Sequence, residues 1–149
     1  MKIENAINQG CFSSVYHKLL LNLMYTYGWI NNLNSKRLRK FGLTPQQYNI
    51  LRILKGQHPT AISVKLITDR MLDPMSNVSR LVDKLVEKEL VSRESCQSDR
   101  RAVNIVITDK GLHLLEELKP SDLELEAHLH TLSESEAEQL NHLLDKLRE

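Results

Sequence analysis

Apolar and polar positions alternate with a helical period between residues 73 and 91. The apolar positions recur at spacings of three and four, which places them on one side of a helix: Val78, Leu81, Val82 and Leu85. Asp73 is a favourable N-cap, and Pro74 suits the first helical position because its missing N–H would be unpaired there anyway. The stretch is therefore predicted to form one amphipathic helix.

The flanking segments resemble the parts of a winged helix-turn-helix. Residues 63–72 are predicted to form a second, shorter helix with Ser63 as its N-cap, joined to the first by a tight connection. Residues 90–94 and 102–107 are strand-like, and in the second run apolar residues alternate to give one apolar face. The polar residues between them, SCQSDRR, are predicted to form a hairpin tip.

Two further helices have clear start signals. Thr44 and Gln47 match a capping box with Pro45 at the first helical position, and Gly56 to Thr60 is expected to end that helix. Another helix is expected to begin at Thr108 and to stop at Pro120.

Apolar stripes also run along both ends of the chain. Residues 12–33 form a long helical pattern with two stripes, one of Phe12, Tyr16, Leu19, Leu20, Leu23, Tyr27 and Ile30 and one of Leu21, Tyr25 and Trp29. A helix apolar on two sides is usually buried between two bodies, here its own domain and a partner subunit, although a plain core helix is an alternative. Ser133 and Glu136 open the last helix with a capping box, and its stripe comprises Leu140, Leu143, Leu144 and Leu147.

These terminal helices lie outside the winged unit, and a two-fold homodimer is the simplest way to cover their apolar residues. The predicted fold is mainly α with a small β-hairpin wing, in one domain spanning 1–149. Within it, residues 43–112 are assigned to a DNA-binding winged helix-turn-helix, and residues 12–40 and 120–149 to dimerisation arms.

Charge is distributed unevenly along the 149 residues, although the net charge is only +1. Residues 36–101 contain 14 Lys and Arg against 7 Asp and Glu, a net of +7, so the remainder carries 20 − 14 = 6 basic and 19 − 7 = 12 acidic residues, a net of −6. A basic block that coincides with the helix-turn-helix indicates nucleic-acid binding.

Composition narrows the class of protein further. Hydrophobic residues make up 41% and charged residues 26%, which is typical of a globular protein. No apolar run approaches the roughly 20 residues of a transmembrane helix, and the first ten residues contain no apolar signal core, so a cytoplasmic protein without a membrane partner is expected. Cys11 and Cys96 form neither a metal-site spacing nor a disulfide framework.

The residues opposite the apolar side of the helix at 73–91 carry the candidate chemistry. These hydrogen-bonding side chains are predicted to reach base edges or phosphates of double-stranded DNA, although a solvated helix face is the alternative: Ser76, Asn77, Ser79, Arg80 and Lys84. At the hairpin tip, Arg100 and Arg101 are expected to approach the minor groove, whose negative potential attracts them. Tyr25 and Trp29 are predicted to line an apolar cleft for an effector, or else to lie in the dimer core.

Catalysis is not expected. The chain contains no HExxH, GxSxG or P-loop motif, and His128 and His130 stand two residues apart, a spacing that does not share a helix face. No metal site and no cofactor are predicted.

Three segments together resemble the MarR family of bacterial winged-helix regulators: LTPQQYNILRIL, SRLVDKLVEKELVSR and DRRAVNIVITDKGLHLLEEL. The resemblance runs from about Phe12 to the C-terminus. It implies a homodimer that binds a pseudo-palindromic operator, usually as a repressor, and that releases DNA on oxidation or when a small phenolic or other apolar effector binds.

The resemblance also assigns roles by position. It places Ser76, Asn77, Ser79 and Arg80 on the groove-reading part of the recognition helix. It makes Arg101 the minor-groove arginine of the wing and Asp99 the acid that braces the wing. Where the family more often has Ser-Pro, this chain has Pro74-Met75, so the helix is expected to start a residue earlier.

Redox sensing is the alternative to ligand sensing. Cys11 precedes Phe12 and lies near Tyr16, which resembles the thiol environment of organic-hydroperoxide sensors in this family, although the Cys–Tyr spacing differs. Cys96 falls at the hairpin tip and is interpreted as incidental.

Overall fold

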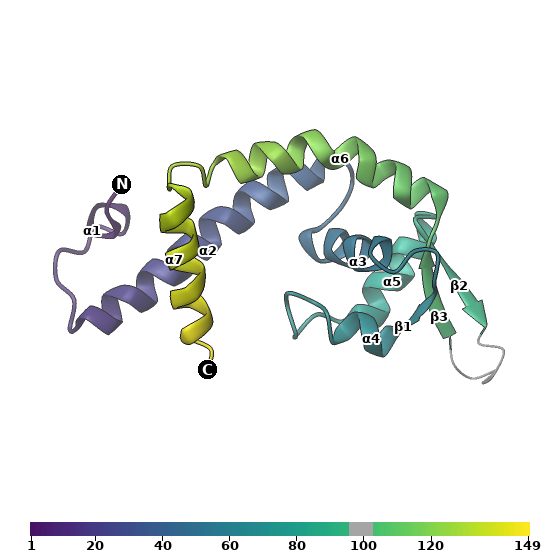
Figure 1. The fold of residues 1–149 in the computed structure, drawn as a ribbon, viewed down its shortest axis with the longest axis horizontal. Coiled ribbons are helices and arrows are strands. Elements are labelled where there is room, and N and C mark those ends of the chain that lie inside the picture. The colour runs from purple at the N-terminus through teal and green to yellow at the C-terminus, as the bar shows by residue number, and fades with distance from the viewer. Residues whose placement is uncertain (96–102) are drawn as a thin grey trace.

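The computed structural model describes residues 1–95 and 103–149 and confirms the predicted fold class (Figure 1). The helices are α1 (Ile3–Ala6), α2 (Val15–Arg39), α3 (Pro45–Lys55), α4 (Val64–Thr68), α5 (Val78–Glu87), α6 (Asp109–Ala127) and α7 (Glu134–Lys146), and the strands are β1 (Ile62–Ser63), β2 (Val91–Ser95) and β3 (Val103–Ile107). Within the described residues, no helix is both long and apolar enough to cross a membrane.

A winged unit forms one end of the molecule, where α3, α4 and α5 pack together beside the strands (Figure 1). Its core is continuous, and the most completely buried side chains are Leu38, Ile50, Leu51, Leu54, Ile67, Val82, Leu85, Ile105 and Leu118. Burial of Val78, Val82 and Leu85, with Leu81 partly buried against the core, confirms the predicted inward side of the helix at 73–91.

The sheet has a strand that the sequence did not indicate. Its order is β1-β3-β2 with both pairs antiparallel, and β2 pairs with β3 from Val91 opposite Ile107 to Ser95 opposite Val103. The short β1 adds Ile62 opposite Ile105. A two-residue strand carries too little alternation to be recognised before its partner is known.

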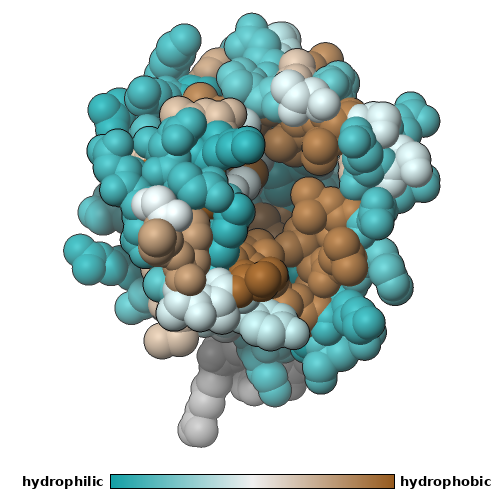
Figure 2. Space-filling view, turned by 90° about the vertical axis from the view of Figure 1, so that its left-hand side faces the viewer, coloured by the Kyte–Doolittle hydropathy of each residue, from teal (hydrophilic) through white to brown (hydrophobic). Residues whose placement is uncertain are grey.

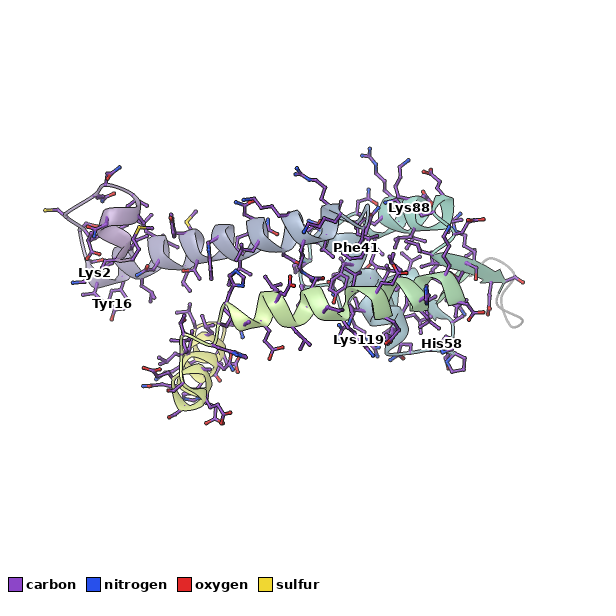
Figure 3. The ribbon with its side chains drawn as sticks, turned by 90° about the horizontal axis from the view of Figure 1, so that it is seen from above. Lys2, Tyr16, Phe41, His58, Lys88 and Lys119 are labelled. Atoms are coloured by element: carbon purple, nitrogen blue, oxygen red, sulfur yellow. The ribbon has the colours of Figure 1, made fainter. Side chains whose placement is uncertain are left out.

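Two long helices, α2 and α6, run side by side from the winged unit toward the chain termini (Figures 1 and 3). The first long helix was predicted at residues 12–33, but it begins after Ser14, whose side chain accepts from the His17 amide, and continues to Arg39. Leu38 is fully buried in the core of the winged unit, so packing extends the helix into that unit.

The predicted stop at Pro120 is wrong, because α6 continues through it to Ala127. An interior proline loses one helical hydrogen bond and costs about 3 kcal/mol. Residues on both sides of it are held by tertiary contacts: Leu118 is fully buried, and Asp122 forms an ion pair with Arg37 of α2. These tertiary contacts offset the cost of the proline. The sequence pattern reveals only that cost and not the contacts.

The predicted caps of the remaining helices are confirmed. Thr44 and Gln47 form the capping box of α3, and Ser133 and Glu136 form that of α7. The Thr108 hydroxyl caps α6 by accepting from the Gly111 amide.

Apolar surface gathers at the end of the molecule opposite the wing, as Figure 2 shows. The exposed large apolar side chains there come from α2, the second half of α6 and α7, among them Tyr16, Leu19, Leu20, Leu123, Leu140, Leu143 and Leu147. Tyr16 lies at the far end of α2 from Phe41 and Lys88 of the winged unit (Figure 3). We refer to residues 1–37 and 119–149 as the arms.

Candidate functional site

Helix α5 begins later and ends earlier than predicted. Its N-cap is Asn77, whose side-chain oxygen accepts from the Arg80 amide at 3.1 Å, whereas Asp73 accepts from the Met75 amide within the preceding turn. The expected helix start at Pro74 is therefore wrong. At the other end, Glu89 has a left-handed backbone (φ 61°), which stops the helix before the predicted end.

This later start changes the surroundings of two predicted base-contacting residues. Asn77 is exposed, but its side-chain oxygen is engaged in the cap. Ser76 is half-buried in the turn, and its Oγ has no hydrogen-bond partner within the described residues. Both side chains therefore lie before the first turn of α5 rather than along its outer side.

Ser79, Arg80 and Lys84 lie on the exposed outer side of α5. The Lys84 ammonium is 2.9 Å from a carboxylate oxygen of Glu87, one turn further on. The Arg80 side chain is likewise exposed to solvent.

An ion pair that the sequence reasoning did not single out joins α5 to the wing. Asp83 on α5 pairs with Arg93 on β2, and both side chains are about half exposed. The predicted wing residues Asp99, Arg100 and Arg101 lie outside the described residues. The charge of Asp83 was visible in the sequence, but its partner depends on how the strand returns beside the helix.

Two exposed apolar side chains in the turn before α5 were also missed. Leu72 is 87% exposed and Met75 is 92% exposed, although both belong to the compact winged unit. The turn is fixed to α3, because the Leu72 amide donates to the Asn49 side chain at 2.9 Å. Because thymine presents a methyl group in the major groove, apolar side chains beside a recognition helix are suited to contact it.

Two adjoining clefts lie where the arms meet the winged unit. The smaller has a volume of about 320 Å³, and the larger about 500 Å³ and reaches the turn before α5. Both are lined by Ile30, Arg37, Tyr48, Arg52 and Leu125. Of the two aromatic residues predicted to line an effector site, Trp29 lines the smaller cleft, with its ring 6.2 Å from that of His128. Tyr25 lies one turn earlier on α2 and lines neither of these clefts.

A charged cluster, formed by Arg37, Tyr48, Arg52 and Asp122, stands between the two clefts. Asp122 accepts from Arg37 at 2.6 Å through one carboxylate oxygen and from the Tyr48 hydroxyl at 2.7 Å through the other. Arg52 donates to the Tyr48 oxygen at 3.0 Å. Burial raises the pKa of the Tyr48 hydroxyl, and the hydrogen bond to Asp122 raises it further, so the residue stays a proton donor.

Cys11 is exposed in the segment between α1 and α2, where its carbonyl oxygen accepts from the Gln9 side chain. The candidate partner Tyr16 is 81% exposed at the start of α2.

Residues 41–102 match the model of the MarR family. The chain is 33% identical over 133 residues to the HTH-type transcriptional regulator MhqR of Bacillus subtilis, covering 87% of this chain and 89% of that protein. It is 31% identical to the HTH-type transcriptional regulator MgrA of Staphylococcus aureus, covering 97% and 90%. These relatives do not favour redox sensing through Cys11 over ligand sensing.

Solved structures have the same fold. A MarR transcription factor from Planctomyces limnophilus matches with a TM-score of 0.70 at 32% identity, covering 91% of this chain and 98% of that one. S. aureus MepR in complex with DNA matches with a TM-score of 0.75 at 27% identity, covering 92% and 97%. Bordetella bronchiseptica BpsR, whose DNA binding is regulated by 6-hydroxynicotinic acid, matches at 0.77 with 21% identity, covering 89% and 99%, and supports the fold alone.

Proposed function

The chain belongs to the MarR family of DNA-binding transcriptional regulators, and from this premise we propose that it is a repressor that binds a pseudo-palindromic operator as a homodimer and is released by a small aromatic effector. Residues 43–112 bind DNA, and residues 12–40 and 120–149 hold the two subunits together.

The apolar surface of the arms supports the homodimer. Helix α7 has no buried residue, although leucines recur along one side of it. A second copy related by a two-fold axis presents the same surface, so the arms of two subunits cover each other. The two α5 helices then face half-sites about one helical turn apart, roughly 10 bp from centre to centre.

The proposal for DNA binding rests on the exposed outer side of α5. Arg80 lies on that side and can donate two hydrogen bonds to a guanine, a contact worth about 1–3 kcal/mol of discrimination against a wrong base. Arg100 and Arg101 are assigned to the wing, where charge and minor-groove width matter more than base identity.

The two clefts support the effector proposal. They combine apolar and aromatic walls with a few polar groups, which is typical of small-molecule sites. The ligand of BpsR, 6-hydroxynicotinic acid, is a single-ring aromatic acid, and a molecule of that size suits a volume of about 320–500 Å³.

Competition binding with single-base variants of a selected operator tests the assignment of base reading to Arg80. Arg80→Ala is expected to reduce the difference in affinity between the operator and random DNA by about 1–3 kcal/mol. Arg148→Ala, just beyond the end of α7, is the matched control and should leave both affinities unchanged. An equal loss for every DNA would make Arg80 a phosphate contact instead.

Arg101→Ala distinguishes the role of the wing in DNA binding from that of α5. This change is expected to weaken operator binding while leaving the base preferences intact, and to lower the salt dependence by about one phosphate contact. If it alters base preference in the major groove, the wing has been assigned the wrong role.

A further inference from the structure

Arg93 lies on the side of β2 that faces the core of the winged unit. Side chains alternate along a strand, so Arg93 shares a side with Val91, which is buried. In the sheet, Arg93 stands opposite Ile105 of β3, which is fully buried. The position therefore continues an apolar side of the sheet to its outer edge, yet it holds a cation, whose guanidinium pairs with Asp83 of α5.

Asp83 is an unfavourable residue for a helix that approaches DNA. It lies on the exposed outer side of α5, one turn after Arg80 and next to Lys84. A carboxylate at this position repels the phosphates that its basic neighbours attract. Core packing does not favour Arg93 and DNA attraction does not favour Asp83, but the ion pair between them accounts for both residues.

The outer half of the β2–β3 hairpin has few other attachments to the helix. The buried pair of Val91 and Ile107 marks its inner end, whereas Glu94, Ser95 and Val103 are exposed. β2 is an edge strand whose only strand partner is β3. Among the described residues, the Asp83–Arg93 pair is the one ion pair between α5 and the hairpin. The pair is therefore placed to set the direction in which the hairpin leaves the core.

We propose that Asp83 and Arg93 form a positioning pair that fixes the angle between α5 and the hairpin, and that they thereby determine specificity without touching a base. This inference rests on the proposed function, in which α5 reads the major groove and the wing approaches the minor groove. A hairpin at a fixed angle fits only a site whose two grooves lie at matching positions, whereas a loose hairpin adjusts to any duplex. The pair therefore contributes to the preference for the operator and not to the general affinity for DNA.

The double variant Asp83→Asn/Arg93→Gln tests the pair without changing the net charge of the protein. Because one negative and one positive charge are removed together, the general attraction to phosphates is retained. Fluorescence anisotropy of the full-length protein at one salt concentration gives the Kd for an operator selected from a random library and for a random duplex. Operator binding is expected to weaken about fivefold, the upper range for an exposed ion pair, while random-duplex binding stays within about twofold.

The exchanged variant Asp83→Arg/Arg93→Asp restores an ion pair between the same two positions. The ratio of operator affinity to random-duplex affinity should return to within about twofold of the wild type. If the ratio stays as low as in the neutral double variant, one of the two side chains contacts DNA directly and the inference is overturned.

Glu89→Gln/Lys110→Gln is the matched control variant. It also removes one exposed ion pair between two elements, at 2.8 Å from the residue beyond α5 to α6, and it also leaves the net charge unchanged. This pair does not touch the hairpin, so both affinities should match those of the wild type. An operator loss equal to that of Asp83→Asn/Arg93→Gln would make the effect a general one and would overturn the inference.

Hydroxyl-radical footprinting distinguishes positioning from a general loss of structure. In Asp83→Asn/Arg93→Gln, protection of the minor groove beside each half-site should decrease, while protection of the half-site covered by α5 persists. An equal decrease at both places, or a lower midpoint of urea unfolding, would indicate a structural role and overturn the inference. A wild type that binds operator and random duplex equally would contradict the proposed function itself. A wild type that discriminates, beside a double variant that discriminates equally well, would overturn the inference alone.

Discussion

Large apolar side chains are mostly buried in the winged unit but mostly exposed in the arms. Within the described chain, every large apolar side chain that is fully buried, except Ile3, lies between Leu38 and Leu118. All but three of the exposed large apolar side chains lie in the arms. The winged unit thus completes its core within one chain, whereas the arms present helices whose apolar sides remain uncovered. The leucines of α7 nevertheless recur at spacings of three and four, as the buried positions of α5 do, so regular spacing indicates burial without saying which molecule provides it.

The three exceptions strengthen this distinction. Leu72, Met75 and Val103 are exposed although they belong to the winged unit. Leu72 and Met75 lie in the turn before α5, and Val103 begins β3 of the wing. These positions adjoin the proposed DNA-reading surface, so we expect them to face DNA rather than a second subunit.

Removal of the C-terminal arm should have the largest effect. A chain that ends at Pro120 is expected to lose the dimer altogether, because each leucine buried in the interface contributes about 1.5–3 kcal/mol. Sedimentation equilibrium distinguishes monomer or aggregate from dimer. A clean dimer of the shortened chain would show that the subunits meet elsewhere.

Alanine substitution of one glycine in each region tests how closely that region is packed. Gly111 of α6 sits against the winged unit, where an added Cβ would collide with the carbonyl oxygen of Leu90 and lie 2.7 Å from Ile107 Cγ1. Gly111→Ala is therefore expected to destabilise the protein by about 1–3 kcal/mol in urea unfolding.

Gly28 of α2 is the counterpart in the arms, since an added Cβ there meets nothing within 4 Å. Gly28→Ala is expected to raise stability by about 0.5–1 kcal/mol, because alanine loses less backbone entropy in a helix. If it instead weakens the dimer, the partner subunit approaches α2 closely at this point.

Met75→Ala tests the exposed apolar residues of the winged unit. The free energy of unfolding should stay within about 0.5 kcal/mol of the wild type, because the side chain is almost wholly exposed. Operator affinity should fall by about 1 kcal/mol if the side chain packs on a thymine methyl group. Unchanged affinity, measured by fluorescence anisotropy, would place Met75 away from the DNA.

The smallest effect is expected from the surface ion pairs of Glu116, one with Lys55 of α3 and one with Lys119 within α6. Neighbouring Lys119 and Lys55 lower the pKa of Glu116 to about 2. A lowered pKa means that the carboxylate stabilises the fold at a pH above its ordinary value and that this contribution is lost as the pH falls through about 2. The melting temperature of Glu116→Gln should thus be slightly below that of the wild type near pH 7, and the two should converge toward pH 2. The difference should also shrink in high salt, because the groups are exposed.

Local signals in the sequence were enough to predict most of the helices and their beginnings. The caps at Ser63, Thr44 and Ser133 were identified in advance, because a hydroxyl that accepts from the amide N–H three residues further on involves neighbours in the chain only. The inward side of α5 followed from its spacing for the same reason. The same spacing placed the base-reading candidates on the opposite, exposed side of the helix: Ser79, Arg80 and Lys84.

Tertiary structure decided what depends on distant partners. Both Asp73 and Asn77 are good caps, and the turn fixed by Asn49 from α3 decided that α5 begins after Asn77. Pro120 remains within α6 because contacts on either side of it outweigh the missing hydrogen bond. The charged cluster of Arg37, Tyr48, Arg52 and Asp122 joins residues up to 85 positions apart. No local pattern encodes such a cluster, because its energy arises only when three helices have already packed together.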